Sequence, residues 1–133
     1  MKQMKCLLLI VPLALMLGCT EPVDPTEVVS ERSKARWDAL IERDFVAARQ
    51  FYTPGFREIT PEFDFRVDMD RRPVRWESAE VNDVACEEGR CTVEVLIGYR
   101  IPSAPGQINN LGNRRPITED WVEIDGEWWF VHE

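Results

Sequence analysis

The clearest structural signal in this chain is ITEDWVEIDGEWWFVH, residues 117–132. Apolar and polar residues alternate on both sides of Asp125-Gly126, and that dipeptide is typical of a two-residue β-hairpin turn. The stretch therefore predicts two antiparallel strands joined by this turn. Pairing across the turn sets three pairs of side chains opposite one another, namely Glu123 and Trp128, Trp121 and Phe130, and Glu119 and His132.

One face of this hairpin is aromatic and carries the only histidine of the sequence. That face holds Ile117, Glu119, Trp121, Glu123, Trp128, Phe130 and His132, and the other holds Val122, Ile124, Trp129 and Val131. Alternation does not say which face is buried. The aromatic face is interpreted as a pocket wall or an interface, or else as an ordinary core with its polar groups at wet edges. A catalytic alternative uses Glu119 to tune His132 as a general base.

A second hairpin is predicted around Cys86 and Cys91, with the loop Glu87 to Arg90 between them. Directly opposed residues of an antiparallel pair lie close enough for a disulfide. A redox-active pair is the alternative, but the spacing is not Cys-x-x-Cys, and a metal site needs two more ligands. We therefore expect a structural disulfide between Cys86 and Cys91.

The other strands are predicted on both sides of this hairpin. Val93, Val95, Ile97, Tyr99 and Ile101 alternate as one buried face, and Val84 joins it if the cysteines are opposed. Trp76 is out of phase, so a bulge is expected near Ser78. Residues 102–116 read as a polar loop.

Helical periodicity precedes the strands, beginning near Val28 and including Trp37, Leu40 and Ile41. A second helix is expected from Asp44, its N-cap, to Tyr52, and it ends at Thr53-Pro54-Gly55. A short third helix, capped by Thr60, is expected to reach Phe65, and residues 66–73 read as a charged surface connection. The fold class is α+β: two or three N-terminal helices on a curved, mainly antiparallel sheet of four or more strands.

The N-terminus is typical of an export signal. Lys2 and Lys5 precede an apolar run from Leu7 to Leu17, which is too short to span a bilayer. Met16-Leu17-Gly18-Cys19 resembles the lipobox of bacterial lipoproteins, which implies acylation of Cys19 and cleavage before it. We expect a signal peptide over 1–18, a lipidated acidic tether over 19–27 and one domain over 28–133. By resemblance to the sorting of enterobacterial lipoproteins, Thr20 after the cysteine implies the outer membrane, with the domain facing the periplasm.

The charge balance excludes one class of partner. The chain has 24 acidic and 16 basic residues, and two of the basic ones lie in the signal. Such a field repels phosphate backbones, so nucleic-acid binding is not expected.

Motifs for metals and catalysis are weak. Asp64, Asp68 and Asp70 lack the glycine and distal glutamate of a calcium loop, so neither a metal nor a cofactor is expected. Arg114-Arg115 reads as a solubilising loop pair, although it has the chemistry to grip an anion. The sequence has no nucleophile elbow, phosphate loop or zinc-binding helix motif.

The layout resembles the nuclear-transport-factor-two-like superfamily, the cone fold that includes ketosteroid isomerase and SnoaL-type proteins. The resemblance rests on Trp37-x-x-Leu40-x-x-x-Asp44-Phe45, on Phe51-Tyr52-Thr53-Pro54-Gly55-Phe56 and on the terminal Asp125-Gly126-x-Trp128 hairpin. It implies a curved sheet wrapped by helices, often with a pocket between them. The tyrosine–aspartate set of the isomerases has no counterpart here, so their activity is not implied.

These observations favour a non-enzymatic envelope lipoprotein that binds a small apolar ligand or a protein partner. Its contact residues would be Trp37, Tyr52, Trp121, Trp128 and Phe130. One alternative is a small-molecule lyase, isomerase or hydrolase that uses Glu119 and His132. Another is a homodimer whose aromatic face is buried between the copies and holds no ligand.

Overall fold

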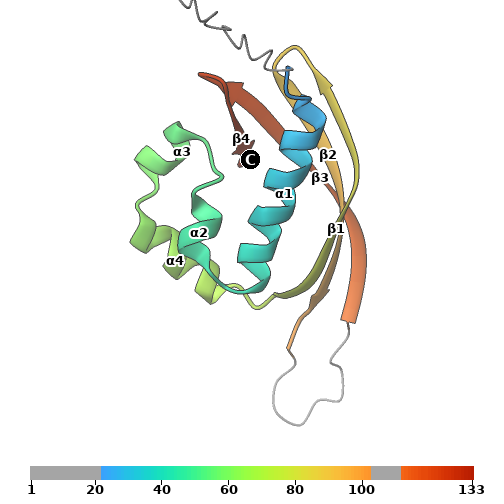
Figure 1. The fold of residues 1–133 in the computed structure, drawn as a ribbon. Coiled ribbons are helices and arrows are strands. Elements are labelled where there is room, and N and C mark those ends of the chain that lie inside the picture. The colour runs from blue at the N-terminus through green and yellow to red at the C-terminus, as the bar shows by residue number, and fades with distance from the viewer. Residues whose placement is uncertain (1–21, 103–111) are drawn as a thin grey trace, which may run out of the picture.

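Four helices lead into a four-stranded antiparallel sheet within residues 22–102 and 112–133, the part of the chain that the computed structural model describes (Figure 1). The helices are α1 (Pro25–Ile41), α2 (Phe45–Arg49), α3 (Pro54–Ile59) and α4 (Glu62–Arg71). The strands are β1 (Arg75–Glu87), β2 (Arg90–Arg100), β3 (Gly112–Ile124) and β4 (Glu127–Val131), in the order β1-β2-β3-β4. The α+β class predicted from the sequence is confirmed.

Helix α1 begins at Pro25, three residues before the predicted domain start. Asp24 is its N-cap and accepts a hydrogen bond from the backbone N–H of Thr26 at 2.9 Å. Proline fits the first helical position because its missing N–H has no intrahelical partner there. The first helical turn therefore takes in residues 25–27, which were expected in the tether. Cys19 and the expected signal over 1–18 lie outside the described residues.

Two helices between residues 53 and 73 differ from the prediction. Thr53 caps α3 through a bond from the N–H of Phe56, so Thr53-Pro54 begins a helix as well as following one. Helix α4 extends to Arg71, and the predicted connection over 66–73 is wrong for most of its length. Phe65 and Met69 lie one turn apart on α4 and are both buried, and this packing holds a charged segment in a helix.

The first hairpin has the predicted register. Cys86 pairs with Cys91 and Val84 with Val93, and the two cysteines are joined by a disulfide. The expected bulge appears as a register shift between Trp76 and Ser78, and a second shift follows between Val81 and Asp83. The predicted buried face ends before Ile101, which lies beyond β2 and is 52% exposed.

The terminal hairpin also forms as predicted over most of its length. Glu123 pairs with Trp128, and Trp121 with Phe130, but the ladder stops one residue before the expected Glu119–His132 pair. Strand β3 starts at Gly112, so residues 112–116 of the predicted loop are strand, and residues 103–111 lie outside the described part.

The segment before α3 runs along the free edge of β4. The N–H of Phe130 donates to the carbonyl of Phe51 at 2.7 Å, and the N–H of Thr53 donates to the carbonyl of Phe130 at 3.2 Å. This short parallel pairing covers part of an edge strand. It also brings Tyr52 beside Phe130, with ring centres 4.9 Å apart.

The aromatic face of the terminal hairpin points into the domain. Trp121 is fully buried and Trp128 is 8% exposed, both in the core that the helices share with β2. The sheet curves around α1, and the shorter helices extend the layer beyond β4 (Figure 1). The structure thus answers the question that alternation left open. Among the described residues, no helix combines the length and apolar character needed to cross a bilayer.

Candidate functional site

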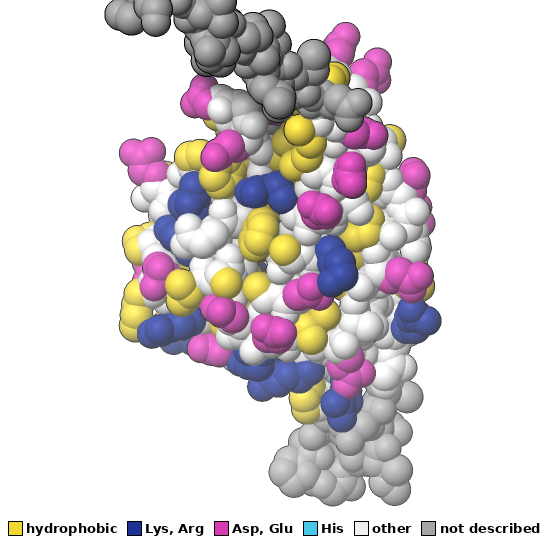
Figure 2. Space-filling model, in the orientation of Figure 1, with side chains coloured by type: hydrophobic (Ala, Val, Ile, Leu, Met, Phe, Trp, Pro, Cys, Tyr) yellow, Lys and Arg dark blue, Asp and Glu magenta, His cyan; other side chains and the backbone are white. Residues whose placement is uncertain are grey.

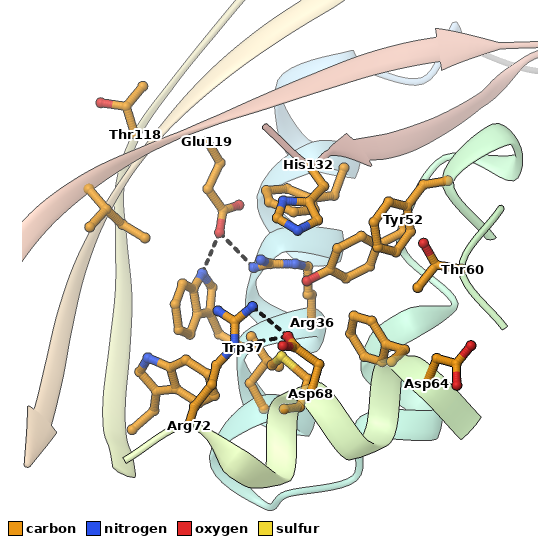
Figure 3. Close-up of a pocket in the computed structure, with 17 residues that line it drawn as sticks. Arg36, Trp37, Tyr52, Thr60, Asp64, Asp68, Arg72, Thr118, Glu119 and His132 are labelled. Carbon is orange, nitrogen blue, oxygen red and sulfur yellow. Dashed lines mark hydrogen bonds and ion pairs between the residues drawn. The ribbon is translucent and has the colours of Figure 1, made fainter. Parts of the chain in front are cut away.

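A pocket of about 520 Å³ opens between the helices and the last two strands (Figure 3). Its walls are largely aromatic and its mouth is polar. It is lined by Arg36, Trp37, Leu40, Tyr52, Phe56, Thr60, Asp64, Phe65, Asp68, Met69, Arg72, Trp76, Ile117, Thr118, Glu119, Phe130 and His132.

The deepest polar group of the pocket is the carboxylate of Glu119, which is 3% exposed. Four side chains donate hydrogen bonds to its two oxygens. They are the Ser33 hydroxyl at 2.8 Å, the Arg36 guanidinium at 2.8 Å, the Trp121 indole at 2.9 Å and the Trp37 indole. An ionised carboxylate offers about four acceptor sites. These donors leave Glu119 no free acceptor for a ligand.

Arg36 supplies the countercharge to Glu119 and is itself 5% exposed. Its guanidinium carbon lies 3.7 Å from the centre of the Phe130 ring and 5.5 Å from that of Tyr52. Its Nε is buried and makes no hydrogen bond within the described residues. Arg36 therefore keeps spare donor capacity in the wall of the pocket, although its charge is compensated.

Helix α1 explains how this polar pair becomes buried. Val29, Ser33, Arg36 and Leu40 follow the three-and-four spacing of one helix face, and all four are buried. Ser33 and Arg36 were not singled out from the sequence, where the helical periodicity was followed through its apolar residues alone. Their spacing from Val29 and Leu40 could have identified them, because polar residues on the apolar face of a helix are candidates for a buried hydrogen-bond network.

The rim of the pocket carries paired charges and His132. Arg72 donates to Asp68 at 2.8 Å, as Figure 3 shows. His132 is packed edge-on against Tyr52, with ring centres 5.8 Å apart. Burial lowers the pKa of His132, and the positive charges of Arg72 and Arg36 lower it further, while Asp68 opposes them. The imidazole is therefore biased toward its neutral form.

Glu119 and His132, the two weak catalytic candidates, line the same pocket. No hydrogen bond joins them within residues 22–102 and 112–133, and the oxygens of Glu119 are occupied by other donors. The carboxylate is thus arranged to hold Arg36 and α1 in place. It is not arranged to orient the imidazole.

The five predicted contact residues divide into two groups. Trp37, Tyr52 and Phe130 line the pocket, whereas Trp121 lies beneath it and donates to Glu119. Trp128 is also in the core, and it borders a smaller hollow near the N-terminus of α1 and the disulfide. Most of the other lining residues were not predicted as site residues, among them Phe56, Arg72, Trp76 and Arg36, because their elements meet only in the folded domain.

The acidic residues considered for a metal lie apart or in ion pairs. Asp68 pairs with Arg72, and Asp70 with Arg43 at 2.7 Å. In the described ranges no three His, Cys, Asp or Glu side chains gather closely enough to hold a metal ion. Arg114, expected in a loop, lies on β3 and pairs with Glu80 at 3.5 Å.

Comparison with known proteins supports the fold and not an activity. No family model and no curated protein matches the sequence. Among solved structures, a SEC-C motif containing protein from Rhodopseudomonas palustris has a TM-score of 0.58 at 18% identity, covering 76% of this chain and 73% of that chain. A proposed dehydratase of the NTF2-like family from Streptomyces avermitilis has a TM-score of 0.54 at 12% identity, covering 78% and 89%.

An LEH-like epoxide hydrolase from M. tuberculosis is similar as well, with a TM-score of 0.51 at 14% identity over 81% of this chain and 84% of that chain. These identities are too low to transfer an activity, because one fold hosts many functions. The shared arrangement of helices on a curved antiparallel sheet is what they establish. This domain has the NTF2-like fold, the architecture of the nuclear-transport-factor-two-like superfamily.

Proposed function

We propose that this chain is a lipid-anchored envelope protein that binds a small molecule in the cone pocket without transforming it. The observation that carries the proposal is the buried Glu119 cluster. A carboxylate that accepts four hydrogen bonds is poorly suited to take a proton from a substrate. The same cluster holds the pocket wall in one geometry, which suits a binding site.

The walls indicate the apolar part of the ligand. A volume of about 520 Å³ falls within the range of small-molecule sites. Trp37, Tyr52, Phe56 and Phe130 present ring edges and faces to it. Aromatic side chains of this kind favour a ligand whose body is flat or ring-containing.

Arg36 indicates the polar part of the ligand. Its Nε–H has no acceptor among the described residues and lies in the wall, whereas Glu119 has no acceptor left. A ligand that carries a carbonyl or carboxylate oxygen would meet that donor, and one that carries only donors would find no partner at this depth. The ligand class that fits is therefore an apolar ring system with a hydrogen-bond acceptor.

A small-molecule lyase, isomerase or hydrolase is the second candidate, and His132 is the observation in its favour. A neutral imidazole at the rim of a pocket can act as a general base. In this alternative, Glu119 holds Arg36 and α1 in place, and His132 is the general base without help from Glu119. The two candidates differ in one respect: an enzyme converts the bound molecule, whereas a binding protein releases it unchanged.

A dimer held together by the aromatic face is disfavoured. Trp121 and Trp128 are buried within one copy of the domain, so they offer no area to a second copy. A protein partner would have to use another surface. This leaves small-molecule binding in the pocket as the better-supported role.

Native mass spectrometry of the full chain, extracted from the envelope in a neutral detergent without refolding, tests this proposal. We expect a reproducible extra mass on the wild-type chain. Phe56→Ala removes a ring from the pocket and should lower the occupied fraction several-fold, because buried aromatic area contributes strongly to binding. Phe63→Ala is the matched control, since Phe63 is 65% exposed and does not line the pocket.

Two results would contradict the binding role. One is a bare chain in every preparation. The other is equal occupancy in both phenylalanine variants. If the released ligand is re-added and recovered as a different compound, by mass for a lyase or hydrolase or by chromatographic retention for an isomerase, and the change disappears in His132→Gln, the chain is an enzyme instead.

The envelope anchor rests on Cys19 and is tested separately. Acyl chains on this cysteine contribute about 0.8 kcal/mol per buried methylene, enough for stable anchoring when two or three are present. Cys19→Ser should move the chain from the membrane fraction to the soluble fraction and abolish incorporation of labelled palmitate. Cys6→Ser lies within the expected signal and should change neither.

A further inference from the structure

Two arginines and a tryptophan form a second cluster of donors, separate from the pocket. The guanidinium carbon of Arg57 lies 4.8 Å from the centre of the Trp129 ring, and that of Arg32 lies 5.4 Å from it. Trp129 follows Trp128 and precedes Phe130 on β4, so its side chain points away from the pocket face. We call Arg32, Arg57 and Trp129 the Trp129 cluster. None of them lines the pocket.

Each member of the Trp129 cluster has a buried N–H group without an acceptor. The groups are Nε of Arg32, Nε of Arg57 and Nε1 of Trp129. In the described residues only one other side-chain atom is in this condition, the Nε of Arg36 at the pocket. Buried donors are nearly always paired. Three unmatched donors from α1, α3 and β4 therefore point to an acceptor that residues 22–102 and 112–133 do not supply.

The same two arginines also lack a carboxylate partner. Four arginines of the described ranges are not exposed, and two of these are accounted for: Arg36 pairs with Glu119, and Arg49 donates to the backbone carbonyls of Arg57 and Thr60. Arg57 donates to the neutral side chain of Gln50 at 3.0 Å, and neither Arg32 nor Arg57 forms an ion pair within the described residues. Glu127 acts on Arg32 electrostatically without forming an ion pair with it, so its carboxylate compensates the two guanidinium groups only in part.

The charges of the Trp129 cluster influence one another. Burial lowers the pKa of the Arg32 guanidinium, Glu127 raises it and the positive charge of Arg57 lowers it again. The two guanidinium groups therefore repel each other while partly withdrawn from water. Figure 2 shows basic side chains on the face that carries α1 and α3, close to apolar ones. A negative group beside them would relieve the repulsion.

We propose that the Trp129 cluster is a binding site for an oxyanion, a carboxylate or phosphate group on a small molecule. Guanidinium groups present planar pairs of N–H donors that match the oxygens of such a group. The indole N–H adds a third direction of approach. Because the three side chains offer donors and no acceptor, the site discriminates against cations and against ligands that only donate.

The proposal is tested on the full chain in a neutral detergent by titrating inorganic phosphate and, separately, acetate at constant ionic strength. The readout is the indole N–H signal of Trp129 in a ¹H–¹⁵N spectrum, identified by its loss in Trp129→Phe. We expect this signal to move saturably with at least one anion while the other four indole signals stay in place. The anion that binds more tightly distinguishes a phosphate site from a carboxylate site.

Variants give the second readout. Arg32→Gln and Arg57→Gln should each weaken anion binding about tenfold, the equivalent of one charge-assisted hydrogen bond. Arg57→Lys keeps the charge but loses the planar donor pair, and it should bind at an intermediate level. Arg66→Gln is the matched control, because Arg66 is exposed and lies 5.9 Å from the ring of Phe63 on α4.

The other indole signals report whether each variant is folded. The proposal is overturned if the Trp129 signal does not saturate with either anion, or if it moves equally with chloride. Wild-type affinity in both glutamine variants would also overturn it. None of these outcomes depends on the pocket, so the small-molecule role of the pocket stands or fails separately.

Discussion

Arg32 and Arg36 lie one turn apart on α1, yet the fold treats them differently. Arg36 is 5% exposed and meets the carboxylate of Glu119 at 2.8 Å. Arg32 is half-buried against the rings of Phe51 and Trp129, at 5.2 and 5.4 Å, without any ion pair in the described residues. Both guanidinium groups stack on aromatic rings, but of the two only Arg36 forms an ion pair within the described part of the chain.

The difference shows what a buried charge requires. Withdrawing a charge from water costs several kcal/mol unless a partner and further hydrogen bonds compensate it. Glu119 provides that partner to Arg36, and Ser33, Trp37 and Trp121 complete its hydrogen bonds. Arg32 is tolerated without one because part of its side chain still reaches solvent. The Arg36 pair is therefore a structural support of the pocket, and Arg32 remains available to an external anion.

Glu119→Gln should have the largest effect on stability. This change leaves the buried Arg36 without a countercharge, so the free energy of unfolding should fall by about 3–5 kcal/mol. Urea denaturation followed by tryptophan fluorescence measures it. Glu123→Gln, an exposed position on the same strand, is the matched control and should stay within about 0.5 kcal/mol of the wild type. A loss as small as that of the control would show that Glu119 does not support the core.

Ser33→Ala should have the next largest effect. It removes a fully buried hydroxyl that donates to Glu119 at 2.8 Å, and a hydrogen bond to a charged group contributes about 1.5–3 kcal/mol. The same denaturation measurement applies. Ser30→Ala lies on the same helix, where Ser30 is only partly buried, and should cost little. Equal losses of stability in the two variants would show that the effect comes from replacing serine in the helix, and not from the lost hydrogen bond to Glu119.

Arg32→Met removes the guanidinium that has no ion pair among the described residues. Methionine keeps an apolar stem of similar reach and removes an unpaired charge, so stability should stay within about 1 kcal/mol of the wild type. Arg36→Met should cost several-fold more, because it leaves Glu119 buried and unpaired. If the two methionine variants were equally unstable, the distinction between the two arginines would be lost.

The smallest expected effect is a dependence of stability on pH through His132. Its pKa is lowered in the folded state from the ordinary value of 6.5, so the unfolded chain binds the proton first as the pH falls. The stability that this group contributes is complete above about pH 6.5 and is lost as the pH falls through the lower, folded pKa. Denaturation midpoints of the wild type and of His132→Gln should therefore converge below that range. Parallel curves would show that the imidazole is not coupled to folding.

Local features of the fold could be predicted because they depend on neighbours in sequence. Asp125-Gly126 places both central residues at positive φ, 52° and 79°, as a tight hairpin turn requires, and this turn sets the register of Trp121 with Phe130. The predicted N-cap Asp44 accepts from the N–H of Ala47 at 3.0 Å for the same local reason. Helix α4 was underestimated because its stability comes from packing of Phe65 and Met69, which no local propensity reports.

The candidate site could be predicted only in part. Trp37, Tyr52 and Phe130 were expected from their aromatic character and spacing, and all three line the pocket. Phe56, on α3, and Arg72, which follows α4, were missed because they reach the pocket through contacts that are distant in sequence. Glu119 was expected in the site, but with His132 as its partner, because the two residues were expected to be opposed in the hairpin. In the structure its charged partner is Arg36 from α1.

By itself, the sequence determined the class of the fold, the Cys86–Cys91 hairpin and the register of the terminal hairpin. Strand alternation and turn chemistry act over a few residues and can be read directly. Only the tertiary structure decided which hairpin face is buried and which charges are paired. Arg36 and Glu119 are 83 residues apart, and their contact exists only once the curved sheet has closed over α1. Once buried, neither charge of this pair is tolerated without the other. The charge pattern of the pocket therefore depends on the tertiary structure, and no single stretch of sequence reveals it.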